Sequence, residues 1–497
     1  MPYRSSTCFR DLASRVQRAG ASEQPHHLAS QQHSHQATTF GDDKVATTMT
    51  AQPASHKRAI SNSKDVSPPS SKRRQQSTTT SKAVANFFTP ASKKEPEKMV
   101  WRVIKNSLLV GRFGAATSAH SGATGKRRVA AFDLDSTLIK SASGKTFSRD
   151  ANDWKWWDSS VPGRLKELHA DGFLIAVISN QGGISLKPDP KTIKSDQKRL
   201  ADFKTKVTAV LSQLDLPISI YAATGRDQYR KPRTGMWQEL LEDHDLEEGD
   251  AIDLDGSVFV GDAGGREAAG GVLKDHSCSD RDFAANVGIP FHTPEEYFRQ
   301  EEPRPFVRTF DPTSLVKDRN QDSTPAPFTF TKTASPEMIV FCGSPGAGKS
   351  TFYWKHLQPL GYERVNQDLL KTRDKCVKSA TALLQDGTSV VIDNTNADAA
   401  TRGVWVALAQ KLQVPVRCVL FTASAKLCEH NDAFRALNIG LETNRESRTM
   451  LPHIAFSGFA SRYSEPSVSE GFVEITKIDF QFEGSAEQSK LWRQFWT

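Results

Sequence analysis

The chain has 497 residues, of which 37% are hydrophobic, and a formal net charge of +8. This length predicts about three domains, and the hydrophobic content is enough to build real cores. Residues 1–100 carry 15 Lys and Arg against 7 Asp and Glu, whereas the other 397 residues carry 50 of each sign. The charge total therefore excludes a general attraction of the folded part for polyanions, and any such contact must come from local sorting of charge.

The six cysteines form no C-x-x-C pair and have no regular spacing, which argues against a zinc site and against a disulfide framework. No apolar run approaches the roughly 18 residues that a membrane-spanning helix needs, and no secretory apolar segment follows Met1. The sequence therefore predicts a soluble intracellular protein that does not contact membranes.

Residues 1–100 are rich in Ser, Thr, Gln, His and Ala without sustained periodicity, which predicts a disordered tail. Lys57-Arg58 and Lys72-Arg73-Arg74 are typical of a bipartite nuclear import signal, although a basic tail that merely improves solubility is the alternative. The first 20 residues carry four arginines against one acid, Asp11, so the first 48 residues could include a mitochondrial transit peptide, which a second start at Met49 would omit. We therefore expect a nuclear protein, with a possible additional mitochondrial form.

Adjacent aromatic residues, Phe87 and Phe88, lie in this polar tail within Ser81 to Pro90, S-K-A-V-A-N-F-F-T-P. Exposed aromatic residues in a disordered segment have no folding role, which favours a docking peptide. The segment resembles the short motif by which replication and repair proteins bind the sliding clamp, although Ser81 stands where that motif usually has Gln.

From about residue 101 to 300, apolar runs alternate with helical patterns, which predicts an α/β domain with a parallel sheet. The strand expected at 129–132 runs into Asp133 and Asp135. Two carboxylates at the carboxyl end of a strand can converge and hold Mg²⁺. One of them can then attack phosphorus while the other handles the leaving group's proton, although a pair that caps the loop is the plain alternative.

Three later segments at strand ends favour the catalytic interpretation. Ser179 begins the segment S-N-Q-G-G, which follows an apolar run. The serine hydroxyl and the backbone amides next to the glycines can bind a phosphate, although a plain turn is the alternative. Lys231 follows the next apolar run and offers an ammonium to a transferring phosphoryl group, and Asp262 ends the run that begins at Val258. Asp253-Leu254-Asp255-Gly256 precedes its strand and is expected to be a turn.

The order acid pair, Ser, Lys-Pro and Gly-Asp resembles the haloacid dehalogenase superfamily of aspartate-nucleophile phosphatases. The resemblance implies that Asp133 is the nucleophile, that Asp135 is the general acid and base, and that Ser179 and Lys231 bind the phosphate. It also implies that Asp262 completes a Mg²⁺ site with Asp133 and Asp135. Only 43 residues separate Asp135 from Ser179, which leaves little room for a large lid and suits an extended or macromolecular substrate.

A proline-containing linker is expected at 301–335, followed by a second α/β domain at 336–497. A strand at 338–342 leads into a complete phosphate loop: Gly343, Ser344, Pro345, Gly346, Ala347, Gly348, Lys349, Ser350 and Thr351. Its backbone N–H groups can bind the phosphates of ATP, Lys349 can reach the β and γ oxygens, and Ser350 can ligate Mg²⁺.

Two further residues of the second domain are candidates for phosphoryl transfer. Asp368 comes 19 residues after Lys349 and could accept a proton from an acceptor hydroxyl, or could instead cap the helix that follows it. Arg435 could belong to a lid over the triphosphate, or could be a solvated surface charge.

Both domains together, over about residues 100–480, resemble the eukaryotic polynucleotide kinase 3′-phosphatases. The most specific marks are F-D-L-D-S-T-L from Phe132, S-G-K-T-F from Ser143, Y-R-K-P-R-T-G-M-W from Tyr229, V-F-V-G-D-A-G-G-R from Val258, G-S-P-G-A-G-K-S-T from Gly343 and I-D-N-T-N from Ile392. The resemblance implies removal of a DNA 3′-phosphate and ATP-dependent phosphorylation of a 5′-hydroxyl by a monomer, with Asp368 as the kinase base and Arg435 as a lid arginine.

The sequence departs from this family at two positions that bear on the sites. Ser136 replaces the usual Gly after the acid pair, and Ala433 stands where relatives often have a further lid arginine. The tail has no room for the forkhead-associated domain of the animal proteins. An RNA end-healing enzyme and a catalytically inactive repair scaffold are the competing functions, and the intact Asp133, Asp135, Lys349 and Asp368 argue against the scaffold.

Overall fold

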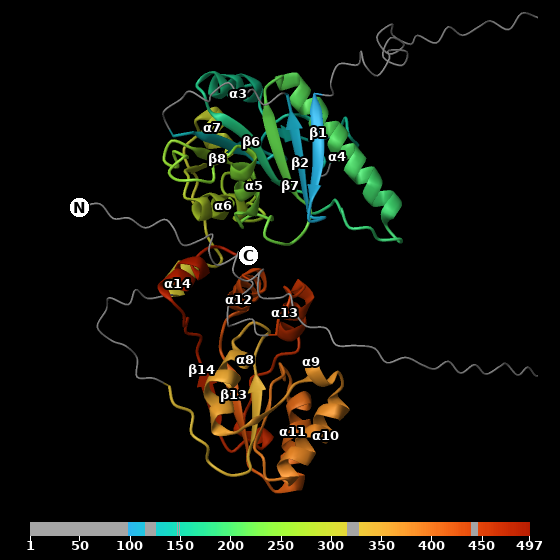
Figure 1. The fold of residues 1–497 in the computed structure, drawn as a ribbon, viewed down its shortest axis with the longest axis vertical. Helices are drawn as coiled ribbons and strands as arrows, with labels where there is room; N and C mark the ends of the chain where they lie inside the picture. Colours follow the sequence, from blue (N-terminus) through green and yellow to red (C-terminus); the bar gives the residue numbers. More distant parts are fainter. Residues whose placement is uncertain (1–97, 115–125, 147, 149, 316–327, 439–445) are drawn as a thin grey trace, which may run out of the picture. The chain divides into compact units, whose positions relative to one another are not determined.

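The computed structural model describes residues 98–114, 126–146, 148, 150–315, 328–438 and 446–497 (Figure 1). The predicted import signal, Phe87 and Phe88 lie outside these residues. Among the helices in the described part of the chain, none is long and apolar enough to cross a membrane. Two α/β regions follow the tail, and each has its own sheet.

The sheet of the first region has seven strands in the order β1-β2-β7-β6-β3-β8-β9. The strands are β1 Met99–Ile104, β2 Leu108–Phe113, β3 Val129–Phe132, β6 Leu174–Asn180, β7 Ile218–Ala223, β8 Val258–Val260 and β9 Phe291–His292, and a separate hairpin pairs β4 Ile139–Lys140 with β5 Lys155–Trp156. Strands β7, β6, β3, β8 and β9 are parallel, as the sequence predicts. Strands β1 and β2 add an antiparallel edge that the sequence analysis did not predict.

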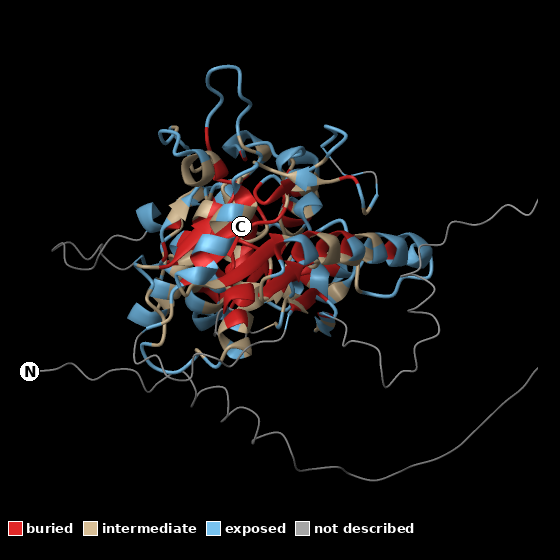
Figure 2. Cartoon of the chain, turned by 90° about the horizontal axis from the view of Figure 1, so that it is seen from above, coloured by how far each residue is buried: buried red, intermediate tan, exposed pale blue. Residues whose placement is uncertain are grey.

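Helices cover both faces of this sheet. They are α3 Val161–Ala170, α4 Ile193–Leu214, α5 Gly235–Asp243, α6 Ser279–Val287 and α7 Pro294–Arg299. Ala130 and Phe132 of β3 pack in the cluster that contains the apolar residues of α3 and α4, whereas Val129 and Ala131 pack in the cluster of α5 and α6. Figure 2 shows the resulting buried strands in red beneath helices whose outer faces are exposed. Burial on both faces is why β3 is an uninterrupted apolar run.

The second region has a parallel five-stranded sheet in the order β11-β12-β10-β13-β14. The strands are β10 Met338–Cys342, β11 Glu363–Val365, β12 Val390–Ile392, β13 Val416–Phe421 and β14 Ile475–Ile478. The helices are α8 Lys349–Phe352, α9 Gln367–Leu370, α10 Arg373–Gln385, α11 Ala399–Leu412, α12 Ala425–Leu437, α13 His453–Ala460 and α14 Ala486–Trp492, with short turns η2 Pro312–Leu315, η3 Tyr353–Leu357, η4 Gln358–Leu360 and η6 Val468–Glu470. Apolar residues of α10 and α11 pack on one face of the sheet, and those of α8 and η3 pack on the other.

Parts of the predicted linker at 301–335 are packed rather than extended. The amide of Val307 donates to the carbonyl of Gly265 at 2.9 Å, and Arg308 pairs with Asp282 at 2.7 Å. On the other side, Phe330 is buried in the second region and the carbonyl of Thr331 accepts from Arg417 at 3.0 Å. These contacts add residues of the predicted linker to the two regions that it joins.

Candidate active sites

The candidate residues of the first region meet at the carboxyl end of its sheet. Asp133 follows β3, Asp262 lies just after β8, and Ser179 lies near the end of β6. Because β3 lies between β6 and β8 and the three strands are parallel, these side chains come to the same edge of the sheet. Lys231, from the segment between β7 and α5, places its Nζ 2.7 Å from Asp133 Oδ1.

A third carboxylate, Asp280, joins this group, and the sequence analysis missed it. Among the described residues, oxygens of Asp133, Asp262 and Asp280 lie within 4.8 Å of one another. Asp280 Oδ1 is 2.8 Å from the Nζ of Lys231, and its Oδ2 accepts from the amide of Ala263 at 3.0 Å. A side chain at Gly261 would place its Cβ 2.2 Å from Asp280 Oδ2, so the glycine allows the close approach.

The buried carboxylates favour a cation beside them. Burial raises the pKa of Asp133 to about 6, and the neighbouring Asp280 adds to the rise although Lys231 opposes it. Burial and the charge of Asp133 raise the pKa of Asp262 to about 8. Burial lowers the pKa of Lys231, but Asp133 and Asp280 outweigh burial and the net pKa is raised. The three carboxylates supply oxygen ligands of the kind that Mg²⁺ prefers, and the ammonium of Lys231, which contacts two of them, offsets part of their charge.

The carboxylate of Asp135 lies apart from the three metal-competent carboxylates. Its Oδ2 accepts from Gln181 Nε2 at 2.7 Å, and its Oδ1 lies 3.1 Å from the Nζ of Lys206. The carboxylate group around Lys231 therefore contains Asp280 rather than Asp135, so the predicted role of Asp135 as a metal ligand stays a prediction, and its side chain is about half exposed. The Ser179 hydroxyl is buried and accepts from the same Gln181 Nε2 at 3.0 Å.

Ser136 has a φ of +61°, in the left-handed region where glycine is favoured. This conformation explains in physical terms why a glycine is the expected residue after the acid pair. The amide of Ser136 donates to the carbonyl of Ile139 at 2.7 Å, which stabilises the turn with a serine in place.

The phosphate loop of the second region connects β10 to α8. Gly346 has a φ of +77°, and a Cβ there would lie 2.2 Å from the carbonyl oxygen of Cys428, so only glycine fits. Lys349 is buried, and its Nζ donates to the carbonyls of Gly343 at 2.8 Å and Ser344 at 2.6 Å. These contacts hold the ammonium inside the curve of the loop, where the phosphates of a nucleotide bind in such loops.

Ser350 donates to Asp393 Oδ2 at 2.9 Å, so the hydroxyl and a buried carboxylate lie together beside the loop. This pair has the donor types that Mg²⁺ prefers. Asp393 directly follows β12 and lies in the segment I-D-N-T-N, which the sequence marked as characteristic without indicating a role for this residue. Arg364 contacts both groups, with its Nε 2.6 Å from Asp393 Oδ2 and its NH2 group 3.1 Å from the Ser350 hydroxyl.

The structure favours a functional position for Asp368 over a capping one. Asn366, not Asp368, caps α9, because its side chain accepts from the amides of Asp368 and Leu369. The Asp368 side chain is 73% exposed and lies 3.4 Å from the guanidinium of Arg448. Asp368 is therefore open to an acceptor hydroxyl.

Arg435 lines the same cavity as the phosphate loop and is only 19% exposed, which does not fit a solvated surface charge. It pairs with Asp432 three residues earlier in α12. Ala433, by contrast, is buried in an apolar cluster with Phe434 and Trp496, so its side chain does not line this cavity.

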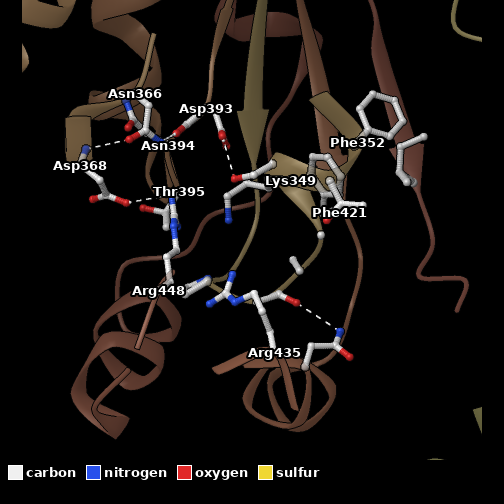
Figure 3. Close-up of a pocket in the computed structure, with 18 of the residues that line it drawn as sticks. Lys349, Phe352, Asn366, Asp368, Asp393, Asn394, Thr395, Phe421, Arg435 and Arg448 are labelled. Atoms are coloured by element: carbon white, nitrogen blue, oxygen red, sulfur yellow. Dashed lines mark hydrogen bonds and ion pairs between the residues drawn. The ribbon is translucent and has the colours of Figure 1, made fainter. Parts of the chain in front are cut away.

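Arg448 is a further cation at this site that the sequence analysis missed, because nothing in its sequence context marks it. It lines the cavity of about 1640 Å³ that also contains Lys349, Asp368 and Arg435. Figure 3 shows the guanidinium groups of Arg435 and Arg448 pointing toward one another. Burial lowers the pKa of both Lys349 and Arg435, and the charge of Arg448 lowers each further. Converging positive charges of this kind are stabilised when an anion binds between them.

Two family descriptions match separate parts of the chain. Residues 128–298 match the family described as polynucleotide kinase 3 phosphatase, and residues 338–466 match the family described as AAA domain. The first match spans Asp133 to Asp280, and the second spans the phosphate loop to Arg448.

Curated relatives cover both regions together. The bifunctional polynucleotide phosphatase/kinase of Schizosaccharomyces pombe is 39% identical over 379 residues, which are 76% of this chain and 84% of the relative. A putative bifunctional polynucleotide phosphatase/kinase of Acanthamoeba polyphaga mimivirus is 32% identical over 74% of this chain and 88% of the relative. The polynucleotide 3′-phosphatase of Saccharomyces cerevisiae is 30% identical over 34% of this chain and 87% of its own length. The chain therefore belongs to the family of bifunctional polynucleotide phosphatase/kinases, with a phosphatase region followed by a kinase region.

Proposed function

We propose that the protein removes 3′-phosphates from DNA ends and phosphorylates 5′-hydroxyls with ATP, so that breaks can be ligated during repair. The observation that supports the proposal is that one chain brings together two different sets of residues suited to phosphoryl transfer. One has Lys231 between Asp133 and Asp280, and the other has Lys349 in a phosphate loop with Asp368 exposed nearby. The names of the relatives support a polynucleotide substrate for both.

In the phosphatase region, an oxygen of Asp133 attacks the phosphorus and the bond from phosphorus to the 3′-oxygen breaks. The 3′-oxygen is a poor leaving group, so protonated Asp135 donates a proton to it as that bond breaks. Asp135 then removes a proton from the water that attacks the phosphorus of the aspartyl-phosphate, which releases inorganic phosphate and restores Asp133. Lys231 offsets the negative charge throughout, since its Nζ already contacts Asp133 at 2.7 Å.

In the kinase region, Asp368 takes the proton of the 5′-hydroxyl while that oxygen attacks the γ-phosphorus of ATP, and ADP leaves. Lys349 and Arg435 supply positive charge to the triphosphate, and Asp368 acts only on the acceptor. The open position of the Asp368 side chain supports this division of roles.

Carboxylates of Asp133, Asp262 and Asp280 would hold Mg²⁺ in the phosphatase region, and Ser350 with Asp393 would hold it in the kinase region. In both places bound Mg²⁺ supplies charge neutralisation to the transferring phosphoryl group.

The test offers the protein ATP and Mg²⁺ with matched DNA and RNA nicks that carry a 3′-phosphate and a 5′-hydroxyl. We expect both DNA ends to be converted, and at a higher rate than the RNA ends. Conversion of the RNA ends alone would instead indicate an RNA end-healing enzyme. If neither the DNA ends nor the RNA ends were converted, the result would indicate a catalytically inactive scaffold.

The proposed repair role extends to the tail, whose basic clusters we propose to direct the protein to the nucleus. Changing Lys72, Arg73 and Arg74 to Ala should then move a fluorescent fusion out of the nucleus, and an unchanged distribution would contradict the import signal.

Phe87 and Phe88 are proposed to dock on the sliding clamp. Changing both to Ala should abolish clamp pull-down while both enzymatic rates stay unchanged, and retained pull-down would contradict the docking role.

A further inference from the structure

Lys206 is a buried lysine on the core-facing side of α4. Phe203, Val207 and Val210 share that side of the helix and belong to the first region's apolar core. Lys206 is only 9% exposed, and lysines are rarely buried to this extent unless their ammonium is paired. Lys194 and Lys198 of the same helix are exposed, as is usual for lysine.

The ammonium of Lys206 meets the carboxylate of Asp135, with its Nζ 3.1 Å from Oδ1. The other oxygen of the same carboxylate accepts from Gln181 Nε2 at 2.7 Å. Asp135 is thus held from two sides, by a helix and by the segment that follows β6. Lys231, the other buried lysine of the site, contacts Asp133 and Asp280 instead.

Asp135 needs such support because its side chain is 48% exposed. An exposed aspartate samples several rotamers, and only a rotamer that faces the leaving oxygen can exchange a proton with it. Misplacement of a catalytic group by about 1 Å can cost on the order of a hundredfold in rate.

We propose that Lys206 is a positioning residue of the phosphatase, which together with Gln181 fixes the carboxylate of Asp135 toward the leaving 3′-oxygen. Lys206 acts through Asp135 and does not bind the phosphoryl group. This inference rests on the proposed phosphatase function of the region.

The test compares leaving groups in Lys206→Met, which keeps an unbranched apolar stem and removes the ammonium. With a 3′-phosphorylated oligonucleotide, kcat should fall by roughly 10- to 100-fold while KM stays within about threefold. With p-nitrophenyl phosphate, the rate of the first burst of nitrophenolate should stay within about threefold, because this leaving group needs no proton. Lys198→Met on the exposed side of α4 is the matched control and should leave every rate unchanged.

Chemical rescue separates positioning from a purely structural role. Ethylamine should restore part of the lost rate in Lys206→Ala and should not affect Lys198→Ala. Gln181→Leu removes the second contact to Asp135 together with the hydrogen bond to Ser179. Because loss of the Ser179 contact should affect both leaving groups equally, a larger loss with the oligonucleotide than with p-nitrophenyl phosphate isolates the effect on Asp135, which keeps the test available if Lys206→Met does not fold.

Equal losses with both leaving groups, or unchanged rates in Lys206→Met, would overturn the positioning role. Glycerol 2-phosphate, whose alkyl leaving group also needs a proton, provides the same comparison without a nucleotide. A wild-type protein that hydrolyses glycerol 2-phosphate and leaves the oligonucleotide intact would overturn the proposed substrate, and the effect of Lys206→Met on glycerol 2-phosphate would still decide the positioning role.

Discussion

Without Mg²⁺, the stability of the phosphatase region should decrease as pH rises, and the carboxylates around Lys231 give the reason. The pKa of Asp133 is raised from its ordinary value to about 6, and that of Asp262 to about 8. A raised pKa means that the folded region binds protons more tightly than the unfolded chain does. The resulting stabilisation is complete below about pH 4 and is lost as pH rises through 6 for Asp133 and through 8 for Asp262.

The size of the effect follows from the shifts. The rise of the Asp133 pKa to about 6 corresponds to roughly 3 kcal/mol, and the rise of the Asp262 pKa to about 8 corresponds to more. Because the charge of Asp133 is itself one cause of the raised pKa of Asp262, the two contributions do not add, and we expect a total loss of about 3–6 kcal/mol between pH 4 and pH 8. Mg²⁺ should remove most of this loss at pH 8 and have little effect at pH 5, where protons compete for the same oxygens.

The assay is hydrogen exchange of the β3 and β8 amides at pH 5 and pH 8, with EDTA or with Mg²⁺, since these strands report on the phosphatase region alone. In EDTA, Asp262→Asn should be more stable than wild type at pH 8 and similar to it at pH 5. Asp255→Asn, in an exposed turn of the same region, is the control and should follow wild type. The reasoning would be refuted if Asp262→Asn and wild type differed in stability by the same amount at pH 5 and pH 8. It would also be refuted if Mg²⁺ stabilised wild type more at pH 5 than at pH 8.

Three further predictions concern the separate chemistry of the two regions, each measured on nicked DNA with both ends followed. Asp133→Asn should lower 3′-phosphate removal by more than about a thousandfold and leave 5′-phosphorylation within about twofold, and substantial residual removal would contradict its role as nucleophile. Lys349→Met should lower the kinase rate by roughly a thousandfold without affecting the phosphatase, whereas Asp368→Asn should stop transfer and keep ATP affinity in equilibrium binding. Arg448→Ala should lower the kinase rate by about 10- to 100-fold, and Arg448→Lys should retain part of the rate that Arg448→Ala loses. An unchanged rate in Arg448→Ala would contradict a role for Arg448 in the kinase reaction.

A central strand of each sheet could be predicted from the sequence because a strand buried on both faces must be apolar throughout. The expected strands at 129–132 and 338–342 match β3 and β10 at both bounds. Strands β1, β11 and β14 were missed because they lie at sheet edges, where exposed positions interrupt the apolar run. Strand β2 lies inside its sheet and was missed because Gly111 and Arg112 interrupt its apolar run. The packing of both ends of the predicted linker was missed because prolines indicate a spacer. The contacts of these ends are with residues far away in the sequence, which local patterns do not reveal.

The shared position of Asp133, Ser179 and Asp262 could be predicted because they lie at strand ends, and parallel strands bring their carboxyl ends to one edge of the sheet. Asp280 and Lys206 come from helices, and Arg448 comes from a segment outside the sheet. Their roles depend on tertiary proximity, which local sequence does not encode. The position of Lys206 among the apolar residues of α4 is an irregularity of the sequence pattern that could have indicated a paired charge.

The two sites favour opposite ligands, and their titrating groups shift in opposite directions for that reason. In the phosphatase region burial makes Asp133 and Asp262 hold protons, so binding of a divalent cation there must be linked to proton release. In the kinase region burial and Arg448 lower the pKa of Lys349, so binding of an anionic triphosphate must favour the protonated lysine. Each site is thus destabilised by its own charge until the ligand of opposite sign binds. Metal binding in one region and nucleotide binding in the other therefore carry opposite pH dependences within a single chain.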